Sequence, residues 1–366
     1  MTQQIKRVLI SGASFAGLTA AYWMNRLGYQ VTVVETASFL KMGGTPVDIK
    51  DDTVDIMRRM GLLDAIKANR IGPEKWEFKN ADDVTELCLQ LEKKPDNEFE
   101  IERDLLLQML YDLVKDEVRF LFGNSISTMT ETTDGMEVQL RDGMREQFHL
   151  VLGCDGVHSH VRRLWFGPEQ DFVHSPGQYF AIAIVNKLLI PEGCYQLYTE
   201  PDKGVALYAY KKKTDIIFTF RPETEISYDF RNSEQQQQII AEQFAGVRWR
   251  TPELLQDLLQ SRSFYFDKFC QVKMDRWARG RVALAGDAAY CASPAAGMGG
   301  SLAIIGATTL GDAFAAHGDD LAAVFDAYDR QLRPFIDRVQ AEALLTLDKL
   351  LPRTEEEIRL RNKQGF

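Results

Sequence analysis

A run of small residues near the start of the chain has the spacing that phosphate-binding turns require. Gly12, Ser14 and Gly17 form the pattern G-x-S-x-x-G, with Phe15 and Ala16 at its last two variable positions. Glycine at the first position permits a tight turn, and a small second residue lets the backbone approach a pyrophosphate. A helix starting here would direct free N–H groups and its positive dipole end at that group. These five residues therefore predict a dinucleotide site.

The segments around this turn are those that such a site needs. Residues 7–10 are an apolar run typical of a buried parallel strand, and residues 16–27 have helical apolar spacing. Residues 30–35 form a second run rich in β-branched residues, which ends in an acid, Glu35. A carboxylate there can accept from a ribose hydroxyl, and it favours a ribose diol over a 2′-phosphate. An ordinary strand–helix turn with two chance glycines is the alternative reading.

A second glycine-rich motif lies near the other end of the chain. The apolar run 281–285 leads into Gly286 and Asp287, whose carboxylate can bind a second ribose-like chain. A glycine-rich turn then opens a predicted helix, whose N-terminus can stabilise negative charge. The candidate residues in this turn are Pro294, Ala295, Gly297, Met298, Gly299 and Gly300. A flexible loop is the alternative, but two such turns so far apart favour a shared ligand.

A third motif follows another apolar run at residues 150–153. Asp155 and Gly156 are by themselves a turn signal. His158 and His160 stand two positions apart, so on a helix they would point apart, and the sequence around them offers no third metal ligand. We expect surface histidines and no metal site.

The remaining segments predict an α/β protein whose Rossmann-like domain is interrupted by an antiparallel sheet and closed by helices. Short strand-like runs separated by turns fill residues 172–268, and helical patterns cover residues 51–67, 103–114, 301–316 and 320–350. The expected division is a first dinucleotide-binding part, an inserted sheet domain for the substrate, a returning dinucleotide-binding part and C-terminal helices, at residues 1–170, 171–268, 269–318 and 319–366.

Composition narrows the choice of partners and compartment. The chain has 366 residues, 45% of them hydrophobic, and a net charge of −10, which disfavours nucleic acid and anionic lipid because both are polyanions. Its five cysteines form no CxxC pair, so neither a disulfide framework nor a zinc site is expected. With no signal peptide and no long apolar stretch, we expect a cytoplasmic protein, and a monomer at this length.

The three motifs, in this order, resemble the class A flavoprotein monooxygenases, which share the fold of para-hydroxybenzoate hydroxylase. The resemblance covers essentially the whole chain. It implies that the first motif binds the ADP half of FAD, that Asp155 and Gly156 serve FAD and NAD(P)H, and that Asp287 binds the ribityl region. It also implies cofactor contacts from Gly44 in the loop from Gly43 to Asp48, from Lys41, and from Arg103 at the start of a helix.

Within that family the chain is most similar to the tetracycline destructases. The resemblance lies in its compact length, in the loop that contains Gly43, and in residues 265–300, which read YFDKFCQVKMDRWARGRVALAGDAAYCASPAAGMGG. It implies substrate contacts from Gln196, Pro294, Ala295 and Gly297. The chain departs from the pattern at Met298, where the family has glutamine, and at Ser301, where it has asparagine. No histidine occurs near residues 216–218, so the substrate stays open.

The resemblance implies an FAD-dependent monooxygenase. NAD(P)H, as NADPH or NADH, would reduce FAD, and oxygen would add at flavin C4a. The resulting hydroperoxide would hydroxylate a small aromatic or polyketide-like substrate, such as a tetracycline. The cofactor carries this chemistry, which is why no protein triad is needed. The alternatives are an FAD-dependent dehydrogenase, oxidase or halogenase on the same scaffold, a flavin-binding protein without activity, and an NAD-dependent dehydrogenase.

Overall fold

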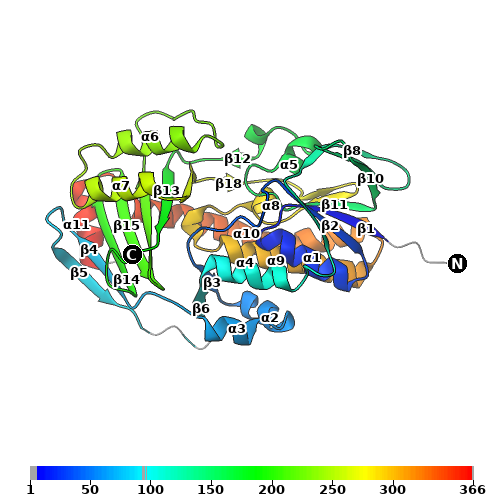
Figure 1. The fold of residues 1–366 in the computed structure, drawn as a ribbon, viewed down its shortest axis with the longest axis horizontal. Coiled ribbons are helices and arrows are strands. Elements are labelled where there is room, and N and C mark those ends of the chain that lie inside the picture. Colours follow the sequence, from blue (N-terminus) through cyan, green and yellow to red (C-terminus); the bar gives the residue numbers. More distant parts are fainter. Residues whose placement is uncertain (1–5, 93–94, 96, 365–366) are drawn as a thin grey trace.

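The computed structural model describes residues 6–92, 95 and 97–364 and arranges them in two lobes (Figure 1). The first lobe is built on a six-stranded sheet in the order β19-β20-β11-β1-β2-β7, in which every neighbouring pair except β19–β20 is parallel. Its strands are β1 (Arg7–Ser11), β2 (Gln30–Glu35), β7 (Arg119–Phe122), β11 (Leu150–Gly153), β19 (Ala278–Arg279) and β20 (Val282–Leu284). The Rossmann-like prediction is confirmed.

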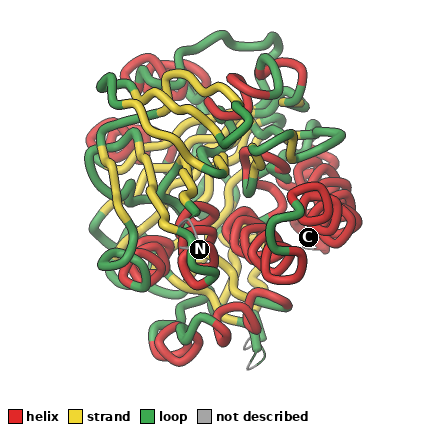
Figure 2. Tube along the Cα trace, turned by 90° about the vertical axis from the view of Figure 1, so that its right-hand side faces the viewer, coloured by secondary structure: helices red, strands yellow, loops and turns green. Residues whose placement is uncertain are grey.

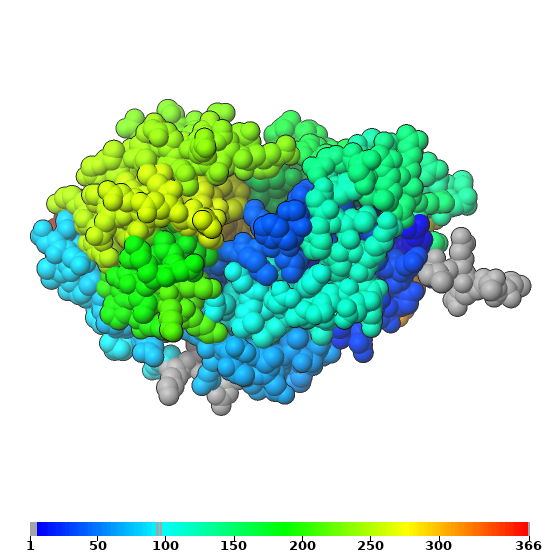
Figure 3. Space-filling view, in the orientation of Figure 1, coloured from blue at the N-terminus to red at the C-terminus, as the bar shows by residue number. Residues whose placement is uncertain are grey.

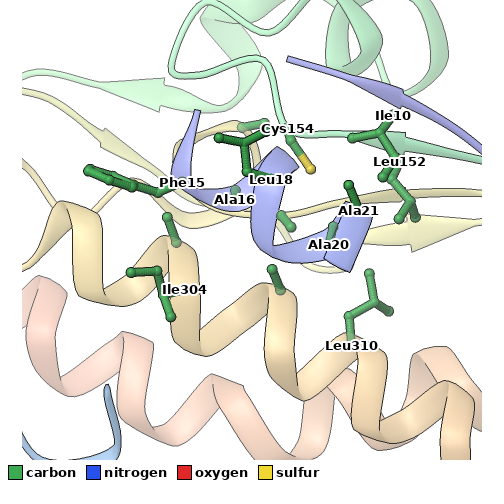
Figure 4. Close-up of a cluster of buried hydrophobic side chains, with 14 of the residues drawn as sticks. Ile10, Phe15, Ala16, Leu18, Ala20, Ala21, Leu152, Cys154, Ile304 and Leu310 are labelled. Carbon is green, nitrogen blue, oxygen red and sulfur yellow. The ribbon is translucent and has the colours of Figure 1, made fainter. Parts of the chain in front are cut away.

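The apolar runs noted in the sequence form the centre of this sheet. Helix α1 (Phe15–Arg26) connects β1 to β2, and it packs between the sheet and α9 (Gly299–His317). Figure 4 shows Ala21 of α1 between Leu152 of β11 and Leu310 of α9. Because α1 is covered on both sides, nine of its twelve residues are buried. Burial on this scale is what holds the start of α1 in place.

The second lobe is a seven-stranded sheet in the order β17-β13-β16-β15-β14-β4-β5. The sequence predicted strands in residues 172–268, and β13 to β17 confirm them. Two strands of this sheet come from outside that range, because β4 pairs in parallel with β14, and β5 pairs with β4. The strands are β4 (Lys75–Lys79), β5 (Thr85–Gln90), β13 (Tyr179–Val185), β14 (Cys194–Glu200), β15 (Lys203–Tyr210), β16 (Lys213–Phe220) and β17 (Ser263–Lys268).

The two faces of this sheet have different coverings. The back face, which includes Cys194, Leu207 and Phe218, packs on α6 (Ser233–Gln243) and α7 (Thr251–Gln260). The front face carries the alternate residues, because successive side chains in a strand point to opposite faces. The registers place Phe180, Ile182, Ile184, Tyr195, Leu197, Ala206, Tyr208, Tyr210, Asp215 and Ile217 on the front face.

The C-terminal helices link the lobes. Helix α10 (Leu321–Leu350) packs along α9 and reaches the front face, where Leu347 belongs to one buried cluster with Phe180. Helix α11 (Glu355–Gln364) then contacts β5 and β14. Viewed from the side, helices flank the strands (Figure 2). Within the described residues, none of the helices combines the length and the apolar character that a bilayer span requires.

The other elements border this framework. They are β3 (Val47–Ile49) with β6 (Phe99–Ile101), the meander β8 (Ile126–Glu131), β9 (Met136–Leu140) and β10 (Arg145–Phe148), the pair β12 (Val173–His174) and β18 (Gln271–Val272), the helices α2 (Asp52–Arg59), α3 (Leu63–Ala68), α4 (Arg103–Asp112), α5 (His160–Trp165) and α8 (Asp287–Tyr290), and the 3-10 turns η1 (Glu169–Asp171) and η2 (Pro294–Ala296). The predicted helix over 51–67 is two helices, because the chain turns at Gly61.

Candidate cofactor and substrate site

The first glycine turn has the geometry that its sequence predicts. Gly12 has φ of 104°, and a Cβ atom added to it would lie 2.3 Å from the carbonyl oxygen of Cys154. Glu35 Oε2 accepts from the backbone N–H of Ala13 at 2.8 Å, so this acid also fixes the turn. Ser14 is the N-cap of α1 but makes no side-chain cap hydrogen bond. The first N–H groups of α1 are therefore not capped by that side chain.

Arg103 places a positive charge beside this helix start. It begins α4, and its guanidinium donates to Ser14 Oγ at 3.2 Å and to the carbonyl oxygen of Gly43 at 2.7 Å. Burial lowers the pKa of Arg103, which Asp104 opposes, but an arginine stays charged. Gly44 lies against the same side chain, since an added Cβ would be 2.6 Å from Arg103 Cδ. Lys41 lies 5.8 Å from the ring centroid of Tyr265.

The second glycine-rich motif meets the first. An added Cβ at Gly286 would lie 2.9 Å from Ala16 Cβ, so β20 ends against the start of α1. Asp287 is exposed while the three residues after it are buried. The carboxylate is thus available to a ligand between the two turns.

The turn that opens α9 is exposed on the same side. Pro294, Gly297 and Gly299 are exposed, and Met298 is an N-cap without a side-chain hydrogen bond. Gly300 packs closely, because an added Cβ would lie 2.7 Å from Val47. Ala295 is buried in a cluster with Phe180 and Phe269, so this turn touches the front face of the sheet.

Asp155 is engaged within the protein. Its Oδ2 accepts from the backbone N–H groups of His160 at 2.9 Å and Val161 at 3.1 Å, and from Ser11 Oγ at 3.3 Å. The carboxylate therefore ties the end of β1 to the start of α5. Gly156 follows with φ of 80° and open space around it.

A cavity of about 610 Å³ lies where the two lobes meet. One wall is the loop with Gly43 and Gly44 and the start of α4. The other wall comes from the second lobe and includes Ile184, Tyr210 and Lys213, all at the sheet's front-face positions. Figure 3 shows this side of the molecule, hollowed where the blue segment near residue 40 meets the yellow-green lobe. The volume lies within the range of small-molecule sites.

Gln196 does not join this group. It pairs with Glu77 of β4, and its Nε2 donates to Glu77 Oε2 at 2.8 Å. Its neighbours on the same side of β14 are Cys194 and Tyr198, which belong to the back-face core. The predicted substrate contact thus lies on the face opposite to the cavity wall.

His158 is partly exposed and has partners that its sequence did not indicate. Its ring stacks on Phe230, and its two nitrogens lie 3.0 Å from Glu169 and 3.3 Å from Asp267. Burial alone would lower the pKa of His158, but the hydrogen bonds to Asp267 and Glu169 outweigh it and raise the pKa to about 10. Among the described residues, no group of three side chains is placed to hold a metal ion.

Two residues at the cavity were not singled out in the sequence. Tyr210 lines the cavity, and Asp215 is the buried carboxylate that accepts from it. A charged residue inside the run KTDIIFTF of β16 is a signal that could have indicated Asp215, because aspartate is depleted in strands.

The residues present fit FAD. An uncapped helix start with an adjacent arginine suits its pyrophosphate, and Glu35 and Asp287 are carboxylates that can accept from its ribose and ribityl hydroxyl groups. The exposed start of the 19-residue helix α9 suits the negative charge of a reduced flavin. Fold and site together define a dinucleotide-binding protein with a second lobe over its ligand.

Comparisons with known proteins agree with this description. Residues 6–343 match the family described as FAD binding domain. An uncharacterized protein of Mycobacterium tuberculosis is 37% identical over 92% of both chains. A flavin-dependent monooxygenase of Legionella longbeachae is 31% identical and covers 98% of this chain and 94% of its own. The crystal structure of tetracycline destructase Tet(51) has a TM-score of 0.87, with 30% identity over 98% of this chain and 95% of that one.

This chain therefore belongs to the FAD-binding family of flavin-dependent monooxygenases. The resemblance to the class A flavoprotein monooxygenases, and within them to the tetracycline destructases, is confirmed.

Proposed function

We propose that this monooxygenase uses NADPH or NADH and O₂ to hydroxylate a small aromatic or polyketide-like molecule, with tetracyclines as the first candidates. The observation that supports it is the cavity between the lobes, which joins Arg103 and Gly44 of the cofactor side to Tyr210 of the front face. FAD, when bound, supplies the redox and oxygen-transfer chemistry. The protein binds the substrate, orients it and excludes water.

Each part of the chain has a role in this proposal. The first glycine turn and Arg103 hold the pyrophosphate, Glu35 the adenosine ribose and Asp287 the ribityl chain. Pro294 and Gly297 flank the flavin ring, and the start of α9 stabilises negative charge on it. The front face of the second lobe covers the substrate, since the cluster of Ala295 with Phe180 and Leu347 brings the turn, the sheet and α10 together. Water kept out by this cover would favour oxygen transfer over peroxide release.

The test starts from the absorbance spectrum of the purified protein and continues with NADPH oxidation in the presence and absence of a tetracycline. Bound flavin, tetracycline-dependent NADPH consumption and an oxygenated product support the proposal. Bound flavin with a response only to other phenols or polyketides keeps the activity and removes tetracycline. NADPH oxidation that yields peroxide and never an oxygenated product identifies an oxidase. A colourless protein that FAD cannot reconstitute overturns the proposal.

A further inference from the structure

A carboxylate without a full set of partners lies behind the wall of the cavity. Asp215 is the third residue of β16 and has no exposed surface. Tyr210 Oη donates to Asp215 Oδ1 at 2.9 Å. Within the described residues, Asp215 Oδ2 has no hydrogen-bond partner. A buried carboxylate oxygen without a hydrogen bond lowers the stability of the fold. We therefore expect Asp215 to have a role other than stabilisation.

Tyr210 connects this carboxylate to the cavity. Tyr210 lines the cavity, and so does Ile184, which is the direct cross-strand partner of Asp215 on β13. Lys213 lines it from β16 itself, two positions before Asp215 and on the same face. Asp215 thus lies one side chain away from the cavity, because Tyr210 lines the cavity and also donates to Asp215.

The charges around Asp215 keep it close to its point of ionisation. Burial raises the pKa of Asp215 to about 7, the Tyr210 hydrogen bond and Lys213 lower it, and Glu100 of β6 and Asp104 of α4 raise it further. The other titratable groups that face it are Tyr195 and Tyr208, whose pKa values burial raises above their ordinary range, to about 12 for Tyr195. Among these neighbours, Asp215 is the group that can take up and release a proton near neutral pH.

We propose that Asp215 accepts, through Tyr210, the proton of a phenolic or enolic hydroxyl group on a substrate bound in the cavity. The substrate O–H bond breaks as its proton moves to Tyr210 Oη, and the Tyr210 proton moves to Asp215 Oδ1. Asp215 becomes a carboxylic acid, Tyr210 ends unchanged, and the substrate becomes an anion. No electrons are transferred in this step. The inference rests on the proposed function, because the anion is the more electron-rich target for oxygen transfer.

Lys213 completes the arrangement. Its ammonium lies 2.7 Å from Glu102 Oε2 at the cavity wall, and Lys211 lies 3.3 Å from the other oxygen of the same carboxylate. These two cations share one anion, and Lys213, which lines the cavity, can stabilise a substrate anion at short range. The substrate class is thus a hydroxyl-bearing aromatic or enol that ionises on binding.

A direct test follows the ionisation of 4-nitrophenol bound to the FAD-loaded protein, since the anion absorbs at longer wavelength than the neutral phenol. In the unmodified protein we expect the anion to form about one pH unit below the pH at which the free probe ionises. Asp215→Asn keeps the size and can accept from Tyr210 but takes no proton, and Tyr210→Phe removes the connecting hydroxyl group. In both variants the bound probe should ionise at the same pH as the free probe, so the shift of one pH unit, about tenfold in proton concentration, is lost. Both variants should retain FAD.

Glu242→Gln is the matched control, because this carboxylate is exposed on α6 and should leave the shift intact. A shift of equal size in the unmodified protein and in both variants overturns the relay, and so does a failure of the probe to bind. Asp215→Glu should restore part of the shift, which separates a proton acceptor from a purely structural residue. Failure of the proposed function is a different result: NADPH oxidation that no substrate stimulates in the unmodified protein.

Discussion

The cofactor side and the substrate side of the cavity were built in different ways. On the cofactor side the decisive contacts involve the backbone, as at Gly12, where a Cβ would meet a carbonyl oxygen at 2.3 Å. On the substrate side they are made by side chains that strand register brings together, as for Tyr210 and Asp215. A backbone constraint requires a particular residue type at a set interval in the sequence. Side chains that meet through strand pairing come from positions whose separation in the sequence is not set. The first kind can be recognised in a sequence, and the second requires the fold.

The strongest way to test this contrast is Gly12→Val. The side chain would collide with Cys154 O, and valine does not tolerate φ of 104°. We expect a loss of more than about 3 kcal/mol in the free energy of unfolding, or no FAD bound at all. Thermal unfolding and the flavin content measure both. Gly28→Asn is the control, since Gly28 also has positive φ but has open space around it. Similar losses in the two variants would contradict a role for close approach.

Asp287→Ala should have the next largest effect. It removes an exposed carboxylate that we expect to accept from the ribityl chain, and a charge-assisted hydrogen bond contributes about 2–3 kcal/mol. The dissociation constant for FAD should rise about 100-fold, and the protein should purify with little colour. The dissociation constant of Asp287→Asn for FAD should lie between those of the unmodified protein and Asp287→Ala. A purified Asp287→Ala protein with full flavin occupancy would show that this side chain does not hold the cofactor.

His158 tests the junction between the two sides, because it lies between Glu169 of the first lobe and Asp267 of β17. Its pKa in the folded protein, about 10, exceeds the ordinary 6.5, so the folded state binds the proton more tightly. The resulting stabilisation is complete below pH 6.5 and declines as the pH rises to about 10.

His158→Gln should therefore lose about 2 kcal/mol of stability at pH 6 and much less near pH 10. Thermal unfolding at the two pH values, with His174→Gln as an exposed control, measures the difference. A deficit of the same size at both pH values would mean that the contact stabilises by packing on Phe230 and not by charge.

The limits of sequence-based prediction follow the same division. The β1–α1–β2 unit, the strands of residues 179–220 and the long C-terminal helices were predictable, because apolar periodicity and glycine spacing are local signals. The parallel addition of β4 to β14 was not, since the two strands are more than 100 residues apart in the chain. The ion pairs of His158 were missed for the same reason: Asp267 lies 109 positions away. Asp155 also accepts from the backbone at the start of α5, which its Asp-Gly turn signal does not reveal.

Gln196 gives the smallest expected effect and the sharpest comparison. It was predicted to contact the substrate, but register puts it on the back face with Glu77, where its Nε2 is a donor to that carboxylate. Gln196→Ala should cost about 1 kcal/mol of stability, because Glu77 loses one donor and keeps Lys75 and Lys79. For a substrate identified in the NADPH oxidation assay, KM should change less than about twofold, since Gln196 makes no contact with a substrate in the cavity. Tyr210→Phe, at the cavity wall on the neighbouring strand, should change KM more than it changes stability. If Gln196→Ala instead raises KM and leaves the unfolding temperature unchanged, the substrate reaches the back face, and the cavity between the lobes is not its only binding surface.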